Sequence, residues 1–458
     1  MTKTPSPALW QQLKETHECL QRVLEGASTS EILLNVPSEL RPATQALLFL
    51  TLRRLGTAKG LVKLLAKKAP KEPAQSLLCV VLAIGSVDVD PMYSDFTLVS
   101  QAVEVAKRNP LMKAQAPFIN GCLRNFLRER IGILASLEND PQSIWNHPLW
   151  WINLLKKQYP NHWGDILKAN NELPPLSMRV NRLRSTRAEL SRSWTEKGIN
   201  HTLQGEQGLI IQSPIAVHLI PGFDEGLCTV QDGGAQMAAQ LLMQGIGVQF
   251  ETLVEDGGPT KKAQKVGPPS LVRILDACSA PGGKTTHLLE YPNVQVTALD
   301  IDPARCKKVH ESCERMGVQA QVVCADAADL DSWWDKELFD AVLLDAPCTA
   351  SGIVRRHPDI RWLRRESDIA QLGEMQKRLL DKTWQVLKIG GKLLFCTCSV
   401  FKQEGEQQVQ SFLRRNTDAS ICTQVGHLLP TLTSKGELLK DNELIDHDGF
   451  FYTLLQKN

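Results

Sequence analysis

Apolar residues recur at helical spacing through the first third of the chain. Leu13, Leu20 and Leu24 lie on one stripe, and residues 47–55 and 77–82 continue the same spacing. Glycine and proline residues separate these segments, as expected between helices. The pattern predicts an all-helical N-terminal domain over residues 1–135.

Residues 136–245 mix helical and extended patterns. Thr186 and Glu189 have the spacing of a capping box and Gly198 is a helix stop, so we predict a helix over 187–197 flanked by strands at 176–181 and 209–212. This indicates linker helices followed by a small α/β module. A cluster of arginines favours contact between this module and a polyanion: Arg179, Arg182, Arg184, Arg187 and Arg192.

The pattern changes again after a stretch poor in apolar residues. Residues 246–270 are predicted to include a flexible loop, because 251–270 are rich in Gly, Pro and Lys. Beyond it, Asp302, Pro303 and Gly317 bound one helix, and apolar spacing that stops at Gly390 predicts another over 369–387. The predicted strands are 271–277, 294–299, 321–324, 339–344 and 392–396. Such alternation predicts a Rossmann-like α/β domain over 271–458, with a mostly parallel sheet covered on both faces.

Length and composition are those of an ordinary multidomain protein. A chain of 458 residues divides into about three domains by length, and its net charge of +2 excludes no class of partner. No apolar run approaches the length of a membrane span, and the twelve cysteines follow no disulfide framework. We therefore expect a cytoplasmic protein with free thiols and no membrane partner.

The first loop of the predicted sheet has the features of a nucleotide site. Small residues and paired glycines let a ligand approach the backbone where a helix begins, and the loop comprises Cys278, Ser279, Ala280, Pro281, Gly282, Gly283 and Lys284. Asp300 follows the second strand and is placed for ribose hydroxyls, while Asp326 follows the third and is placed for a base edge. The loop is not GxGxxG, so S-adenosylmethionine fits it better than NAD.

Two thiols follow the fourth and fifth strands. Because ligands bind beyond the carboxyl ends of parallel strands, Asp345, Cys348 and Cys398 should converge on one crevice. Thiols in this position indicate covalent chemistry rather than packing. Cys396 is expected to point to the opposite face or to be buried, and it has no ligand-spaced partners for zinc, so we expect no metal.

Two segments are strongly basic. Residues 53–71 hold seven Lys or Arg and no acid, which suits a solvated face or a phosphate-binding surface equally. Residues 355–365 interleave arginines with Trp362 beside the predicted crevice, which favours a grip on a phosphate backbone. The candidate RNA contacts are Arg179, Asn181, Arg355, Arg356, His357 and Arg361.

These residues resemble a known family. The ordered segments DACSAPGGKTTH, LDID, DAPCTASGIVRRHPDIRW, CTCSV and DGFFY are similar to the motifs of RNA cytosine C5 methyltransferases of the NOL1/NOP2/Sun type, over Arg179 to the C-terminus. Residues 117–130, PFINGCLRNFLRER, resemble part of a NusB-like RNA-binding domain. The sequence departs from the usual motif residues at Ser279, Thr349 and Gly234, and none of these departures replaces either thiol.

The resemblance implies a role for each candidate. Cys398 would be the nucleophile that adds to cytosine C6, Cys348 would help to resolve the covalent intermediate, and Asp345 would orient the base and border the cofactor. The loop 278–284, with Asp300 and Asp326, would hold S-adenosylmethionine. The expected substrate is 16S ribosomal RNA, unassembled or in an early small-subunit particle, and the expected state is a monomer.

Other functions stay open from the sequence. The same chemistry on tRNA or large-subunit rRNA differs only in substrate. A non-catalytic RNA-binding or ribosome assembly factor suits the N-terminal domain, but both thiols and Asp345 argue against it. A nicotinamide oxidoreductase fits least, because the dinucleotide fingerprint is lacking.

Overall fold

The computed structural model describes residues 7–87, 91–213, 215–248, 271–430 and 446–458. The chain forms two compact units: Met1–Leu173 with Val354–Glu366, and Pro174–Ile353 with Ser367–Asn458. Residues 136–173 thus group with the helical unit, whereas the sequence pattern had grouped them with the small α/β module. The predicted loop at 246–270 lies outside the described residues from position 249 onward.

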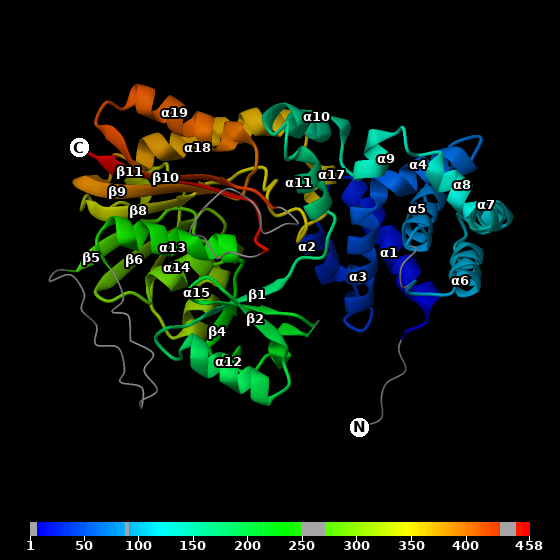
Figure 1. Cartoon of the computed structure of the whole chain (residues 1–458), viewed down its shortest axis with the longest axis horizontal. Coiled ribbons are helices and arrows are strands. Elements are labelled where there is room, and N and C mark those ends of the chain that lie inside the picture. Colours follow the sequence, from blue (N-terminus) through cyan, green and yellow to red (C-terminus); the bar gives the residue numbers. More distant parts are fainter. Residues whose placement is uncertain (1–6, 88–90, 214, 249–270, 431–445) are drawn as a thin grey trace. The chain divides into compact units, whose positions relative to one another are not determined.

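The first unit is helical, as its apolar spacing predicts. Helix α5 buries every residue except Gln75, which is typical of a helix enclosed by others. The core also takes Leu20 from α1, Leu48 from α3 and Phe126 from α7. The helices, labelled where there is room in Figure 1, are α1 (Leu9–Leu24), α2 (Thr29–Ile32), α3 (Arg41–Arg53), α4 (Leu55–Leu65), α5 (Ala74–Gly85), α6 (Asp95–Arg108), α7 (Ala116–Arg128), α8 (Arg130–Ala135), α9 (Pro141–Trp145), α10 (Leu149–Gln158) and α11 (Trp163–Ala169).

A segment from late in the chain completes this unit. Residues 354–366 carry the short helix α17 (Ile360–Leu363), and Trp362 packs against the helical core. The Trp362 Nε1 donates a hydrogen bond to the Leu52 carbonyl at 2.8 Å, and Asp359 accepts one from the Thr29 amide at 2.9 Å. The basic segment predicted beside the crevice is therefore partly built into the helical unit.

The second unit begins with a small antiparallel sheet, ordered β2-β3-β1-β4. Thr186 and Glu189 form the predicted capping box at the start of α12 (Arg187–Glu196), whose Trp194 is buried with Met178 and Leu209. The strands are β1 (Leu176–Val180), β2 (His201–Gln204), β3 (Gly208–Ile211) and β4 (Cys228–Val230). Strands β1 and β3 match the predicted strands within one residue, but β2 and β4 had no apolar alternation to predict them.

The larger sheet has the order β10-β11-β9-β8-β5-β6-β7. Strands β9 to β7 are parallel, and β11 and β10 add to the edge antiparallel, so the predicted mostly parallel sheet is confirmed. The strands are β5 (Val272–Asp276), β6 (Val294–Asp300), β7 (Gln321–Cys324), β8 (Phe339–Asp345), β9 (Leu387–Thr397), β10 (Ala419–Leu428) and β11 (Phe450–Lys457).

Helices cover both faces of this sheet (Figure 1). One face is covered by α13 (Gly233–Gly245), α14 (Gly283–Leu288) and α15 (Pro303–Met316), and the other by α18 (Glu366–Thr383) and α19 (Glu406–Arg415). The short α16 (Leu330–Trp333) follows β7. Asp302, Pro303 and Gly317 bound α15 as predicted, with Gly317 at φ +70°.

The predicted helix over 369–387 was too long. Helix α18 ends at Thr383, and Leu387 begins β9, where it pairs with Phe339 of β8. An apolar residue such as Leu387 fits a helix stripe or a strand equally, so hydrogen bonding to a distant strand decides between them.

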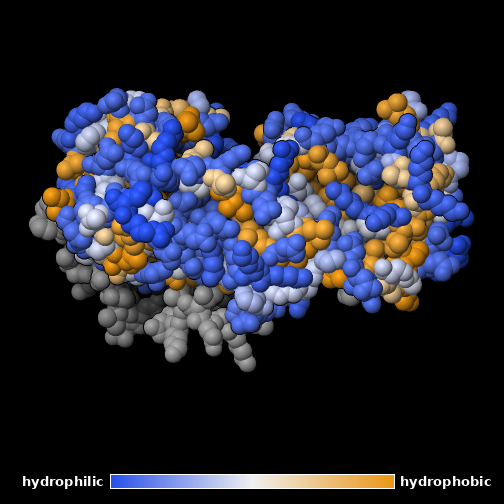
Figure 2. Space-filling model, turned by 90° about the horizontal axis from the view of Figure 1, so that it is seen from above, coloured by the Kyte–Doolittle hydropathy of each residue, from blue (hydrophilic) through white to orange (hydrophobic). Residues whose placement is uncertain are grey.

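Hydrophilic residues cover most of the molecular face drawn in Figure 2, with hydrophobic residues in small groups among them. A search of the described helices finds none long and apolar enough to cross a membrane.

Candidate active site

The strand order creates a topological switch point between β5 and β8. The chain runs outward from β5 through β6 and β7, then returns to the other side of β5 as β8. Ligands bind at such points, beyond the carboxyl ends of the strands. Asp276 ends β5 and Asp345 ends β8, so the two carboxylates flank the place where a ligand is expected.

The predicted cofactor loop links β5 to α14. The Ser279 amide donates to the Leu299 carbonyl at 2.8 Å, which ties the loop to β6. Gly282 has φ +101°, and a Cβ there would lie 3.2 Å from the Val309 Cα and 3.1 Å from the Ser312 Cβ. Only glycine adopts this conformation without strain, so the loop depends on Gly282 to pass close under α15.

Asp300 and Asp326 end or follow the next two strands, as predicted. The buried Asp300 accepts hydrogen bonds from the Ala280 amide at 3.3 Å and pairs with Arg305 at 3.2 Å. Asp326 accepts one from the Ala328 amide at 2.9 Å and forms an ion pair with Arg378. Both carboxylates thus lie along the carboxyl edge that begins at the cofactor loop.

The residues of this edge fit S-adenosylmethionine. The Asp276 Oδ1 and Ser279 Oγ are buried without a hydrogen-bond partner among the described residues, and a ligand's amino or hydroxyl groups would satisfy them. Burial raises the pKa of Asp276 to about 7, although the Thr285 hydroxyl donates to it at 2.6 Å and opposes the rise. Asp300 would hold the ribose and Asp326 the adenine edge.

The two predicted thiols meet at the next strand ends. Cys348 follows β8 and Cys398 follows β9, and these strands are parallel neighbours in which Asp345 pairs with Cys396. The two sulfur atoms lie 3.4 Å apart. The hydrogen bond with Cys398, then burial and negative charge, raise the pKa of Cys348 well above its usual value, so Cys348 rests as a neutral thiol.

Lys284 joins the cofactor loop to the thiols. Its ammonium forms an ion pair with Asp345, which also accepts a hydrogen bond from the Cys396 sulfur at 3.5 Å. Burial alone would lower the pKa of Lys284, but the charges of Asp345, Cys396 and Cys398 raise it overall. Lys284 therefore carries a positive charge where the cofactor loop meets the end of β8.

Cys396 was predicted either to point to the opposite face of the strand or to be buried, and in the structure it is fully buried. The described part of the chain has no cluster of three or more His, Cys, Asp or Glu able to hold a metal ion.

Sequence reasoning missed one residue of the site. Glu404 is a fully buried carboxylate that accepts hydrogen bonds from Thr349 and Ser399, the neighbours of the two thiols. No local pattern could have singled it out, because it stands in the hydrophilic stretch KQEGEQQ.

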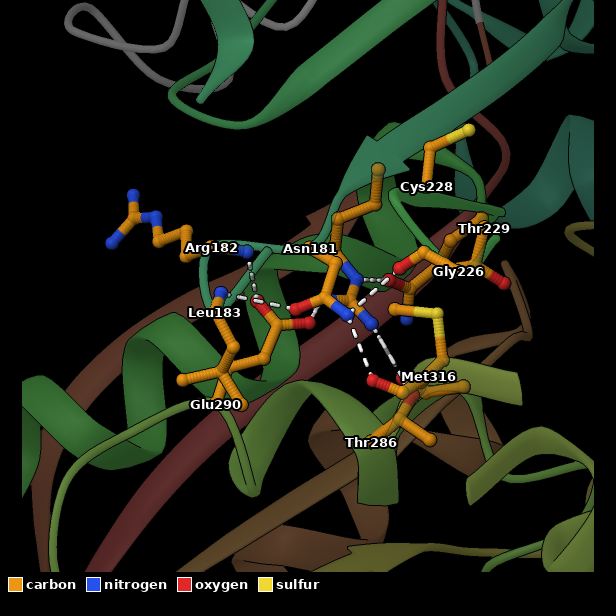
Figure 3. Close-up of polar contacts among 12 residues, drawn as sticks. Asn181, Arg182, Leu183, Gly226, Cys228, Thr229, Thr286, Glu290 and Met316 are labelled. Atoms are coloured by element: carbon orange, nitrogen blue, oxygen red, sulfur yellow. Dashed lines mark hydrogen bonds and ion pairs between the residues drawn. The ribbon is translucent and has the colours of Figure 1, made fainter. Parts of the chain in front are cut away.

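The structure corrects the expected RNA contacts of Arg179 and Asn181, which are both 0% exposed. Arg179 forms an ion pair with Glu290 and donates to Gln231 at 2.6 Å. The Asn181 Nδ2 donates to the carbonyls of Gly226 and Met316, each at 2.9 Å (Figure 3). Both side chains fasten the small sheet to α14 and α15, which leaves no surface on them for RNA.

Arg361 is corrected for the same reason. Its guanidinium is buried and donates to the carbonyls of Asn146 and Asn170 and to the side chain of Asn171, and burial lowers its pKa to about 9. Arg355 is 3% exposed and is likewise unavailable. Arg356 and His357 are half-buried, so contact with RNA stays a prediction for these two.

Comparisons with known proteins identify the family of the chain. The model of the 16S rRNA methyltransferase RsmB/F family matches residues 265–456, and that of the RsmF/B-like ferredoxin-like domain matches 147–218. Ribosomal RNA small subunit methyltransferase B of Vibrio cholerae is 37% identical, covering 94% of each chain, and the same-named Escherichia coli protein is 36% identical over 95% of this chain and 96% of that one. The chain belongs to the RsmB/F family of rRNA methyltransferases. This confirms the resemblance drawn from the motifs.

Solved structures show that the fold is shared beyond close relatives of this RsmB/F member. The crystal structure of PH0851 has a TM-score of 0.70 at 23% identity, covering 97% of this chain and 99% of that one. A methyltransferase homologue from Pyrococcus horikoshii has a TM-score of 0.54 at 23% identity, covering 70% of this chain and 98% of that one. The α/β expectation for the catalytic part is thereby confirmed.

Proposed function

We propose that this RsmB/F member methylates C5 of a specific cytosine in 16S ribosomal RNA through a covalent bond between Cys398 and cytosine C6. The observation that carries the proposal is the pair of sulfur atoms 3.4 Å apart, at strand ends beside the cofactor loop. The Vibrio cholerae relative, named for the small ribosomal subunit, supports 16S rRNA as the substrate.

Cys398 starts the reaction. Cytosine C5 is too electron-poor to attack a methyl donor, but addition of the Cys398 thiolate to C6 makes C5 an enamine-like nucleophile. The Lys284 ammonium, bound to Asp345, offsets negative charge that develops at N3 of the ring. S-adenosylmethionine, when bound, supplies the electrophilic methyl group. Asp345 orients the ring by accepting a hydrogen bond from its amino group.

Cys348 acts after methyl transfer. The C5 proton must leave before the C6–S bond can break and release Cys398, and we assign its removal to Cys348 or to a water that Cys348 holds. The Cys348 pKa is raised first of all by its hydrogen bond with Cys398. Once Cys398 is bonded to cytosine this cause is gone, so the pKa of Cys348 falls, its thiol releases its proton to solvent more readily, and the resulting thiolate can accept the C5 proton.

The target cytosine must leave its stack to reach these thiols, which favours a single-stranded loop of rRNA. We propose that Arg356 and His357 contact the rRNA backbone, and that a monomer acts on rRNA that is unassembled or in an early small-subunit particle. Replacing both residues with alanine should weaken rRNA binding and flatten its dependence on salt, as measured by filter binding.

The test is incubation with methyl-labelled S-adenosylmethionine and unmodified 16S rRNA, with tRNA and large-subunit rRNA as competing substrates. Label should appear at cytosine C5 in 16S rRNA alone. Label in tRNA or large-subunit rRNA would support the same reaction on a different RNA substrate. No label in any RNA would contradict the methyltransferase proposal and favour a non-catalytic RNA-binding or assembly factor.

Variants separate the two thiols. Cys398→Ala should form no protein–RNA adduct, whereas Cys348→Ala should let a covalent species accumulate on denaturing gels. Cys422→Ala is the matched control, since Cys422 is exposed on β10 and contacts Lys392 instead of the other thiols. An adduct that persists in Cys398→Ala would reverse the assignment.

A further inference from the structure

Glu404 ends the short 3₁₀ turn Lys402–Glu404 that follows the second thiol. Its side chain is fully buried and accepts hydrogen bonds from the Thr349 amide at 2.8 Å, the Thr349 hydroxyl at 2.5 Å and the Ser399 hydroxyl at 2.6 Å. A buried carboxylate is costly unless such bonds compensate it, and bonds to an ionised acceptor are about twice as strong as neutral ones. The site therefore retains a buried charge for which packing alone gives no reason.

The partners of Glu404 explain that charge. Thr349 directly follows Cys348 in the chain, and Ser399 directly follows Cys398. One carboxylate thus binds the neighbours of both thiols, although the two loops lie about fifty positions apart in sequence. Moving either loop would break bonds to the same group, so Glu404 couples their positions.

A second set of hydrogen bonds closes the same arrangement. The Ser351 hydroxyl lies 2.8 Å from the Ser399 hydroxyl and accepts from the Val400 amide at 2.9 Å. The Gly352 amide donates to the Cys398 carbonyl at 2.9 Å. The two loops are therefore joined at several residues that directly follow the thiols, which helps to hold the sulfur atoms at contact distance.

The charge of Glu404 also distinguishes the two thiols. After the hydrogen bond with Cys398, burial and the charge of Cys398, the Glu404 carboxylate is a further cause that raises the pKa of Cys348. Cys398, in contrast, lies on the side of the pair where Lys284 forms its ion pair with Asp345, whose charge is the main cause that raises the pKa of Lys284.

We propose that Glu404 is a positioning residue that holds the Cys348 and Cys398 loops together and so keeps the two sulfur atoms at contact distance. The catalytic meaning of this inference rests on the proposed function. The effect on the thiols is a property of the free protein and is measured without RNA.

The experiment compares Glu404→Gln with wild type in the full-length protein. Alkylation of each cysteine by iodoacetamide is followed against pH by mass spectrometry of its peptide. Glutamine keeps the size and removes the charge, so the Cys348 profile should move to lower pH, with its rate at pH 8 rising roughly tenfold for each pKa unit lost. Methyl transfer should fall at least tenfold in kcat with little change in KM for S-adenosylmethionine.

Glu406→Gln is the matched control. Glu406 lies two positions further on, is partly exposed and pairs with Lys402 at 3.8 Å, so its loss should leave the Cys348 profile and kcat unchanged. If Glu404→Gln does not fold, Thr349→Val and Ser399→Ala decide, since each removes one hydroxyl from the same carboxylate. Each should lower kcat severalfold in a protein that still folds, with a moderate fall in melting temperature from the lost hydrogen bond.

Two outcomes are distinct. A folded Glu404→Gln protein with an unmoved Cys348 profile and kcat within twofold of wild type would overturn the inference, even if rRNA is methylated. If the wild-type protein labels no RNA but the Cys348 profile still shifts in Glu404→Gln, the proposed function is overturned. The role of Glu404 in holding the two thiol loops then still stands.

Discussion

Arg179 is the residue whose loss should cost the second unit most stability. It is fully buried, forms an ion pair with Glu290, and donates to Gln231 at 2.6 Å, Thr286 at 3.3 Å and the Gly283 carbonyl at 3.4 Å. Arg179→Met leaves Glu290 buried without its partner. Removing one member of a buried pair costs about 3–5 kcal/mol, which lowers the melting temperature of a unit this large by about 6–20 °C.

The deficit should depend on pH with a definite sign. Burial raises the pKa of Glu290, and Arg179 is the main group that opposes this rise, so the pKa should climb further in Arg179→Met. A carboxyl whose folded pKa lies above its unfolded value destabilises the fold at high pH, and the deficit shrinks as pH falls through the folded pKa. The variant should therefore lose more stability at pH 8 than at pH 5.

Calorimetry at the two pH values, with hydrogen exchange of the α14 peptides, measures this effect. Glu206→Gln is the control, because Glu206 is 63% exposed and its bridge to Arg182 is worth about 1 kcal/mol or less. Arg179→Met combined with Glu290→Gln should recover part of the loss, since both charges are gone. A melting temperature within 2 °C of wild type for Arg179→Met alone would refute the reasoning, on the scale of about 2–4 °C per kcal/mol.

Three further predictions concern the site. Lys284→Met removes the ion-pair partner of Asp345, so kcat for methyl transfer should fall about tenfold or more; an unchanged kcat would contradict the role given to this pair. Asp300→Asn should weaken S-adenosylmethionine binding about tenfold or more in calorimetric titration, by loss of a charge-assisted hydrogen bond, while leaving rRNA binding intact. Gly282→Ala places a Cβ 3.2 Å from the Val309 backbone at φ +101° and should cost about 1–3 kcal/mol in urea unfolding.

Several features of the fold follow from local sequence. The capping box at Thr186 and Glu189, and the Pro303 and Gly317 that bound α15, act within one turn of helix and are read directly from residue type. The carboxyl ends of parallel strands meet at one edge, so thiols at two strand ends indicate one crevice. The pairing of Cys348 with Cys398 was predictable for this reason.

Features that depend on distant partners were decided by tertiary structure. Arg179 and Arg361 look like surface cations in sequence. In the fold both are buried, and each binds a partner more than a hundred positions away: Arg179 binds Glu290, and Arg361 binds the Asn170 carbonyl. Leu387 joined a strand because β8 supplied hydrogen bonds that a helix stripe does not reveal. Glu404 shows the same limit at the site itself. A hydrophilic pattern assigns a glutamate to the surface, and only the convergence of Thr349 and Ser399 from two loops makes its burial stable.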